Sequence, residues 1–311
     1  MDKILYFNGC SWPEGSELND LYTEGEGYLK ECKDRCSTLL SSKLGYEEIN
    51  ESYAGKSHQD IIEETINFAY KNKTKSEDII INVWLTSPER MWFYFGDKPF
   101  IFSPWMILRG ICPHQTEESD WKEMKSDVIK FTKLWTTYFH NQKFFLHQYI
   151  RDVLLLYNTL QSLGYKFLIT NAFYNFGNNW KHNLPFYEDS EMTHLDDLSN
   201  HDLWNDIVSK LPEDNFLFGN VKYSIKDKLL DLWELQKNDY VGTYDTSKLS
   251  SILVADEHEW KDKEPNYFFC EQGHPSELGA MKISELIEKH YNKYNFTGSG
   301  FHFLDGTERE I

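Results

Sequence analysis

The stretch "EDIIINVWL", residues 77 to 85, carries the strongest strand signal in the sequence. Its short, continuous apolar run is typical of a buried strand. Three shorter or weaker runs are also predicted as strands: "KILYF" (3 to 7), "EEIN" (47 to 50) and "YKFLIT" (165 to 170). Helical patterns fill the intervals at 32 to 45, 57 to 73 and 144 to 164. This alternation of strand and helix predicts an α/β fold, with a parallel sheet covered by helices on both faces.

Two long insertions interrupt the alternation. Residues 91 to 143 are rich in aromatic side chains, and residues 174 to 262 contain short helical patterns at 201 to 211 and 226 to 238. No Pro/Gly/Ser-rich linker separates a second domain. We therefore expect residues 1 to 311 to form a single domain in which the insertions pack over the ends of the strands.

The composition narrows the class of protein and its partners. Acidic residues outnumber basic residues by 50 to 32, which gives a formal net charge of -18. Such a surface repels nucleic-acid phosphates and anionic membranes, so no nucleic-acid partner is expected. The N-terminal apolar stretch is too short for a signal peptide or a membrane span. The five cysteines form no CxxC pair. These features predict a cytoplasmic protein with reduced thiols and no membrane insertion.

Chemically useful groups follow the predicted strands. Gly9-Cys10-Ser11 follows the first strand, and Gly55 follows the second in a turn that leaves free N–H groups before a helix. Thr86 follows the third strand, and His274 lies near the C-terminus with Glu271 three residues before it. In open parallel sheets, ligands bind at the carboxyl ends of the strands. The sequence therefore predicts a site built from these groups.

Four blocks of this sequence resemble the SGNH hydrolases, also called GDSL-type esterases. They are "FNGCSWPEG" (7 to 15), "YAGKSHQDI" (53 to 61), "NVWLTSPER" (82 to 90) and "EQGHPSELG" (271 to 279). The first and last blocks are the most specific, and together the four cover less than a fifth of the chain. The resemblance implies a flavodoxin-like, three-layer α/β/α sandwich and a serine esterase that needs no cofactor or metal.

The resemblance also implies a role for each site residue. Ser11 is expected to be the nucleophile, His274 the general base, and Glu271 the acid that orients the base. The oxyanion would be bound by the N–H groups of Ser11 and Gly55 and by the Thr86 hydroxyl.

Three departures from the family pattern bear on these roles. Cys10 stands where the family has aspartate, Glu271 replaces the usual aspartate, and Thr86 stands at the position of an asparagine oxyanion donor. Ser87 and Asn82 remain alternatives for that donor. Asp256 is the next candidate for the acid, and Arg90 is a candidate ligand for an anionic group of the substrate.

Other interpretations stay open at this point. Ser11 could simply cap the helix that follows it. The fold could instead serve as a binding module for carbohydrate or protein, with an inactive triad. A metal enzyme is a third class, with potential ligands at His194, Asp196, Asp197 and His201. For the esterase, the expected substrate is a small acyl ester, with an acylated carbohydrate as the first candidate because of the aromatic insertion.

Overall fold

The computed structural model describes residues 3–16, 18, 22–23, 27–28, 34–86, 88, 90–95, 98–108, 110, 112, 116–139, 142–172, 202–219, 224–226, 228–232, 268 and 274–296. At its centre is a parallel sheet in the order β4-β1-β5-β8. The four strands are β1 (Ile4–Asn8), β4 (Glu47–Asn50), β5 (Ile79–Leu85) and β8 (Lys166–Asn171). In the register of the central pairs, Ile4 lies opposite both Glu47 and Ile79.

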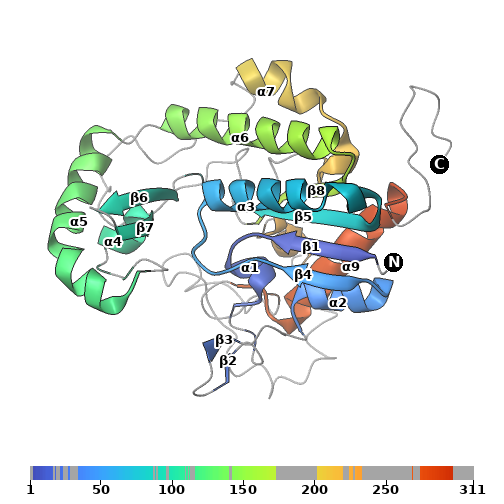
Figure 1. Cartoon of the computed structure of the whole chain (residues 1–311), viewed down its shortest axis with the longest axis horizontal. Coiled ribbons are helices and arrows are strands. Elements are labelled where there is room, and N and C mark those ends of the chain that lie inside the picture. Colours follow the sequence, from blue (N-terminus) through green and yellow to red (C-terminus); the bar gives the residue numbers. More distant parts are fainter. Residues whose placement is uncertain are drawn as a thin grey trace.

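Helices cover both faces of this sheet (Figure 1). One layer contains α2 (Cys36–Leu44) and α9 (Glu277–Lys293), and the other contains α3 (His58–Lys71) and α6 (Gln142–Ser162). Because successive side chains of a strand point to opposite faces, β1 feeds both cores. Leu5 and Phe7 pack in the cluster with α2 and α9, whereas Tyr6 packs in the cluster with α3 and α6. The predicted three-layer α/β/α architecture is confirmed.

The central strand β5 is buried along its whole length. Its odd-numbered residues from Ile79 to Leu85 contribute to the core beneath α3 and α6, and Ile80 and Trp84 contribute to the opposite core. The predicted strand began two residues earlier, but Lys73–Asp78 form the 3-10 helix η1. Two isolated parallel bridges, Ile169 with Phe216 and Asn171 with Ser224, add pairing to β8.

The first insertion forms a lobe with an apolar cluster of its own. It contains an antiparallel hairpin of β6 (Met91–Phe95) and β7 (Lys98–Phe102), followed by α4 (Pro104–Leu108) and α5 (Glu118–Tyr138). Phe100, Phe102, Trp121 and Met124 are among the buried residues of the cluster. The lobe lies on the side toward which the arrowheads of β1 and β4 point (Figure 1). The sequence analysis expected an aromatic-rich insertion here but no strands.

The remaining described elements are short. They are α1 (Ser11–Glu14), β2 (Tyr22–Thr23), β3 (Gly27–Tyr28), α7 (Asp202–Asp206), η3 (Val208–Lys210) and η4 (Glu213–Asn215). Residues 225–226 and 228–232 are helical and overlap the helical pattern predicted at 226 to 238. Most of that insertion lies outside the described residues. In the part of the chain that the structure describes, no helix is both long and apolar enough to cross a membrane.

Candidate active site

The turn that carries Ser11 follows β1 directly. A Cβ atom on Gly9 would lie 2.6 Å from Cγ of Pro13 and 2.8 Å from Cβ of Trp84, so only glycine fits at this position. Cys10 is the N-cap residue of α1 and makes no side-chain capping hydrogen bond, while Ser11 is the first residue of the helix. The interpretation of Ser11 as a helix cap is therefore wrong. Ser11 is 7% exposed, and its N–H has no acceptor within the helix because it belongs to the first turn.

His274 meets this serine from the other end of the chain. Its Nε2 lies 2.8 Å from Oγ of Ser11, which is hydrogen-bonding distance. Pro275 follows His274, and Ser276 then caps α9 by accepting a hydrogen bond from the N–H of Gly279 at 3.1 Å. The capped helix thus fixes the segment that carries the histidine. The predicted partnership of Ser11 and His274 is present in the geometry.

The second turn lies beside the first. The N–H of Glu51 donates to the carbonyl of Phe7 at 2.9 Å, and the N–H of Tyr53 donates to the carbonyl of Gly9 at 3.4 Å. Gly55 has a φ of 80°, a left-handed conformation that favours glycine. Two residues later Ser57 begins α3 with a capping box, in which Ser57 and Asp60 each satisfy the other's N–H. The capping box therefore uses part of the N–H groups that were expected to be free at the start of this helix. Gly55 precedes the capping box by two residues.

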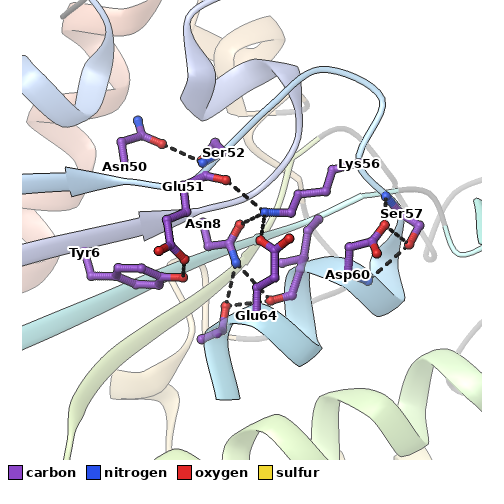
Figure 2. A network of polar contacts seen from close by, with 11 residues as sticks. Tyr6, Asn8, Asn50, Glu51, Ser52, Lys56, Ser57, Asp60 and Glu64 are labelled. Carbon is purple, nitrogen blue, oxygen red and sulfur yellow. Dashed lines mark hydrogen bonds and ion pairs between the residues drawn. The ribbon is translucent and has the colours of Figure 1, made fainter. Parts of the chain in front are cut away.

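A buried lysine links the two turns (Figure 2). The ammonium group of Lys56 donates to Oδ1 of Asn8 at 2.6 Å and to the carbonyl of Glu51 at 2.8 Å, and it also pairs with the carboxylate of Glu64. The Lys56 side chain is fully buried. Burial lowers the pKa of Lys56, and the Glu64 carboxylate opposes that shift. The ring of Tyr53 adds a cation–π contact, with its centroid 4.4 Å from the ammonium nitrogen.

Asn8 extends this network into α3. Its Nδ2 donates to the carbonyl of Ile61 at 3.1 Å and to Oγ1 of Thr65 at 3.0 Å (Figure 2). Asn8 is the last residue of β1 and is fully buried. A single hydrogen-bonded unit therefore holds the end of β1, the turn around Gly55 and the first turns of α3 in fixed relative positions.

Thr86 follows β5 and is fully buried. Its Oγ1 accepts a hydrogen bond from Nη1 of Arg90 at 3.2 Å. Burial raises the pKa of the Cys10 thiol, while the charge of Arg90 and a hydrogen bond with the Thr86 side chain act to lower it. Thr86 thus accepts a hydrogen bond from Arg90 and lies close enough to Cys10, the neighbour of Ser11, to affect the pKa of its thiol.

Asn82, one of the two alternatives for the oxyanion donor, makes its hydrogen bonds inside the fold. It lies in the middle of β5, where its Oδ1 accepts a hydrogen bond of 2.5 Å from the hydroxyl of Tyr291 on α9. Its Nδ2 donates to the carbonyl of Tyr6 at 3.4 Å. Both ends of this amide are used inside the fold.

Several predicted residues lie outside the described part of the chain. These are Glu271, Ser87, Asp256 and the four potential metal ligands His194, Asp196, Asp197 and His201. Among the described residues, no group of three or more His, Cys, Asp or Glu side chains could hold a metal ion.

The sequence analysis did not identify Glu14 as part of the site. Glu14 is 6% exposed, and its carboxylate accepts a hydrogen bond of 2.7 Å from the Ser16 hydroxyl. Burial raises the pKa of Glu14, while the Ser16 hydroxyl, the charge of His274, the N–H of Ala54 and the charge of Arg35 act to lower it. Its position three residues after Ser11 was the available signal, because residues three apart share a helix face.

Comparisons with known proteins were made at the level of sequence and of fold. No family model matches the sequence, and the search of curated proteins found no match. Among solved structures there are matches to proteins described as G-D-S-L family members.

One such match is to a protein from Desulfitobacterium hafniense DCB-2 that is described as lipolytic and of the G-D-S-L family. The TM-score is 0.39 and the sequence identity is 10%, and the match covers 93% of this chain and 99% of that chain. Phospholipase A1 from Streptomyces albidoflavus NA297 has the same score and identity, over 93% and 100% of the two chains. A protein from Parabacteroides merdae ATCC 43184 described as a GDSL-like lipase has a TM-score of 0.35 and 11% identity, over 94% and 96%. The functional argument therefore rests on the geometry of the site itself.

Proposed function

We propose that the protein is a serine hydrolase that cleaves an acyl ester through an acyl-enzyme. The observation that carries this proposal is the 2.8 Å hydrogen bond between Oγ of Ser11 and Nε2 of His274. A serine hydroxyl is a weak nucleophile until a base accepts its proton, and imidazole is the usual base. Ser11 also begins a short helix after a parallel strand, at the edge of the sheet where ligands bind.

In the acylation step, Oγ of Ser11 forms a bond to the acyl carbon while its proton moves to Nε2 of His274. The carbonyl oxygen takes up the negative charge of the tetrahedral intermediate. When that intermediate collapses, the ester C–O bond breaks and His274 returns the proton to the leaving alkoxide. A water molecule then repeats the sequence on the acyl-enzyme and releases the acid.

The oxyanion would be stabilised by the N–H groups of Ser11 and Gly55. Thr86 stays the third candidate donor, through its side-chain hydroxyl. Removing one donor of this kind typically lowers the rate about 10²–10³-fold. Glu271 remains the predicted acid that orients His274.

The proposed substrate is a small acyl ester, with an acylated carbohydrate as the first class to examine. The aromatic lobe of residues 91 to 143 lies on the side of the sheet that carries Ser11, which supports a role for this lobe in specificity (Figure 1). Arg90, which donates to Thr86, is proposed to contact an anionic group where the substrate has one.

The test combines covalent labelling with turnover. A fluorophosphonate probe should attach to Ser11, and the purified protein should hydrolyse p-nitrophenyl acetate or butyrate. Because His274 must be neutral to accept a proton, both labelling and turnover should fall in acid. Intact-protein mass spectrometry and peptide mapping identify the labelled residue.

Three variants sharpen the result. Ser11→Ala and His274→Ala should abolish labelling and turnover while circular dichroism shows the fold intact, and Ser209→Ala, at an exposed serine, should leave both unchanged. An adduct on Cys10, or a folded wild-type protein that takes no adduct at any pH, would overturn the proposal. The latter result would favour the binding-module alternative.

A further inference from the structure

The turn that carries Gly55 belongs to a defined type. The N–H of Lys56 donates to the carbonyl of Tyr53 at 3.4 Å, which closes a β-turn over residues 53 to 56 with Gly55 in its third position. Gly55 has a φ of 80°. A positive φ of about this size at the third position, together with a hydrogen bond between the first and fourth residues, identifies a type II turn. We call this segment the 53–56 turn.

The type of the 53–56 turn sets the direction of the Gly55 N–H. This N–H belongs to the peptide between Ala54 and Gly55, the two central residues of the turn. Between types I and II, ψ of the second residue changes by about 150° and φ of the third by about 170°, which nearly reverses this peptide. The glycine therefore gives the proposed oxyanion donor its direction within the turn, but it does not fix where the turn lies relative to Ser11.

The placement of the 53–56 turn depends on its two corners. At the first corner, the N–H of Tyr53 donates to the carbonyl of Gly9 at 3.4 Å. At the fourth corner, the ammonium group of Lys56 donates to Oδ1 of Asn8 at 2.6 Å (Figure 2). A charged donor at this shorter distance makes the stronger hydrogen bond. Both acceptors lie just before Ser11 in the chain, so Lys56 ties the 53–56 turn to the segment that carries Ser11.

The Lys56 ammonium group is held on several sides. Its side chain is 0% exposed, and it also donates to the carbonyl of Glu51 at 2.8 Å and pairs with the carboxylate of Glu64 on α3. The ring centroid of Tyr53 lies 4.4 Å from the ammonium nitrogen, so the lysine joins the first and fourth corners of the turn. A buried ammonium group is tolerated only while such partners are kept. The end of β1, the 53–56 turn and α3 are therefore held together around one cation.

We propose that Lys56 is a positioning residue for catalysis, whose buried ammonium group fixes the 53–56 turn so that the N–H groups of Gly55 and Ser11 converge on the oxyanion. This inference rests on the proposed serine-hydrolase function. The charge of the tetrahedral intermediate then meets two donors whose separation is set before the substrate binds, and preorganised donors of this kind stabilise the transition state most. Since the carbonyl oxygen of the bound ester carries less charge, misplaced donors should slow the reaction more than they weaken binding.

Lys56→Met tests this role because it keeps an unbranched apolar side chain and removes the ammonium group. We expect kcat for p-nitrophenyl acetate, per site titrated with a fluorophosphonate, to fall about 10- to 100-fold, because a displaced donor costs less than the loss of about 10²–10³-fold that follows removal of one. KM should change less than about threefold. The rate of fluorophosphonate labelling at Ser11 should fall by a similar factor, since a phosphonyl oxygen occupies the same place. A purely structural role would lower stability and leave kcat per titrated site unchanged.

Lys166→Met is the matched control. Nζ of Lys166 donates to the carbonyl of Phe296 at 2.9 Å, and this half-buried lysine begins β8 at the edge of the sheet opposite Ser11. Its replacement also removes a lysine hydrogen bond inside the fold, so stability should fall, whereas kcat and the labelling rate should stay within about twofold of wild type. A loss of kcat equal to that of Lys56→Met would show that any lost lysine contact slows turnover, and would overturn the inference.

A double-mutant cycle with Gly55→Ala tests whether Lys56 acts through this donor. Alanine is strained at a φ of 80°, so Gly55→Ala should disturb the direction of the N–H and lower kcat by itself. If Lys56 acts through Gly55, the double variant should lose no more than about threefold beyond the larger of the two single losses. A double loss equal to the product of the single losses would mean that the two residues act independently, and would overturn the inference.

Tyr53→Leu covers the case in which Lys56→Met does not fold. It removes the ring that the ammonium group contacts at the first corner, and a contact of this kind predicts a loss of about 2- to 5-fold in kcat. Tyr70→Leu, at a tyrosine of α3 that is 54% exposed, is its control and should keep wild-type kcat. Wild-type kcat in Tyr53→Leu would then overturn the inference. Wild-type kcat and labelling in folded Lys56→Met would overturn the inference alone, whereas a folded wild-type protein that takes no fluorophosphonate at Ser11 would overturn the proposed function.

Discussion

Lys56 is the residue that most clearly links the stability of this protein to its site. Its ammonium group is fully buried and serves three acceptors, from β1, from the turn that carries Gly55 and from α3 (Figure 2). Burying a cation is favourable only when its hydrogen bonds are all made. The lysine therefore stabilises one relative arrangement of the two turns.

Replacing Lys56 should be strongly destabilising. Lys56→Met leaves Oδ1 of Asn8 and the carbonyl of Glu51 without this donor inside the fold, whereas the Glu64 side chain is 41% exposed and can turn to water. An unsatisfied buried acceptor costs about 1–3 kcal/mol; Asn8 is fully buried and the Glu51 carbonyl partly so, and with up to two such acceptors we expect a loss of about 1–6 kcal/mol in the free energy of unfolding.

Urea denaturation measures this loss, and Lys43→Met provides the matched control. Lys43 pairs with Glu288, but its side chain is 52% exposed. Exposed pairs contribute about 0–1 kcal/mol, so the control should stay close to wild type. Equal losses in the two variants would show that the buried network does not stabilise the fold.

At the scale of elements, α3 combines a well-capped start with a buried histidine. His58 directly follows the capping residue Ser57, and its ring stacks on Tyr149 of α6 with centroids 5.0 Å apart. Its Nε2 lies 4.0 Å from Oδ2 of Asp152, too far for a hydrogen bond. Burial lowers the pKa of His58 to about 3, so the folded protein holds this ring neutral.

This histidine should make the fold sensitive to acid. In the unfolded chain a histidine has a pKa of about 6.5, so below that pH the unfolded state binds a proton that the folded state refuses. The contribution of His58 to the free energy of unfolding is fully present above about pH 6.5. This contribution is lost as the pH falls toward 3, and the loss is at most about 1.4 kcal/mol per pH unit. Between pH 7 and pH 5 the loss should be about 2 kcal/mol.

Urea denaturation of the wild type and of His58→Gln at both pH values isolates this contribution. The wild type should lose about 2 kcal/mol more than the variant on acidification. Asp60 and Glu14 have pKa values raised by burial and act in the opposite direction, but both proteins contain them and they cancel in the comparison. His147→Gln, at an exposed position of α6, should show the wild-type slope. Identical slopes in wild type and His58→Gln would contradict the assignment.

At the scale of the whole molecule, the formal net charge of -18 should act against the fold. Like charges repel more strongly in the compact state, and salt screens that repulsion. We expect Tm at pH 7.5 to rise between about 20 and 300 mM NaCl, since the Debye length then falls below about 10 Å. Near pH 5, close to the isoelectric point of about 5.0, the same salt step should change Tm little. A Tm that falls with salt at pH 7.5 would mean that attractive ion pairs outweigh the net repulsion.

Local patterns were enough to predict the layers, whereas the serine–histidine pair was predicted from the resemblance of two sequence blocks to the SGNH hydrolases. Six of the seven residues of β5 are apolar, and this run, together with the helical patterns between the strands, predicted the parallel sheet. The topology of such a sheet brings the strand ends to one edge. The blocks that carry the resemblance place Ser11 after the first strand and His274 before the last helix, and the structure has α1 and α9 at these positions.

Other features depend on partners that are distant in the sequence. The β6–β7 hairpin forms because two aromatic segments pack on α5, which periodicity within each segment does not reveal. Lys56 and Glu14 read as ordinary surface residues, since charged side chains are rarely fully buried. Their burial follows from groups on β1, α3 and the histidine segment, and only the assembled fold brings these together.

The distance along the chain between Ser11 and His274 has a consequence for biosynthesis. The two residues are separated by 263 positions, and the histidine segment is fixed by α9, which packs against α2. On the ribosome the nascent polypeptide therefore acquires its hydroxyl and both turns early but receives its base only after the sheet has been translated. Every incomplete translation product that lacks residue 274 carries the proposed nucleophile Ser11 without the proposed base His274. Under the proposed function, premature termination before residue 274 should yield fragments that do not hydrolyse acyl esters.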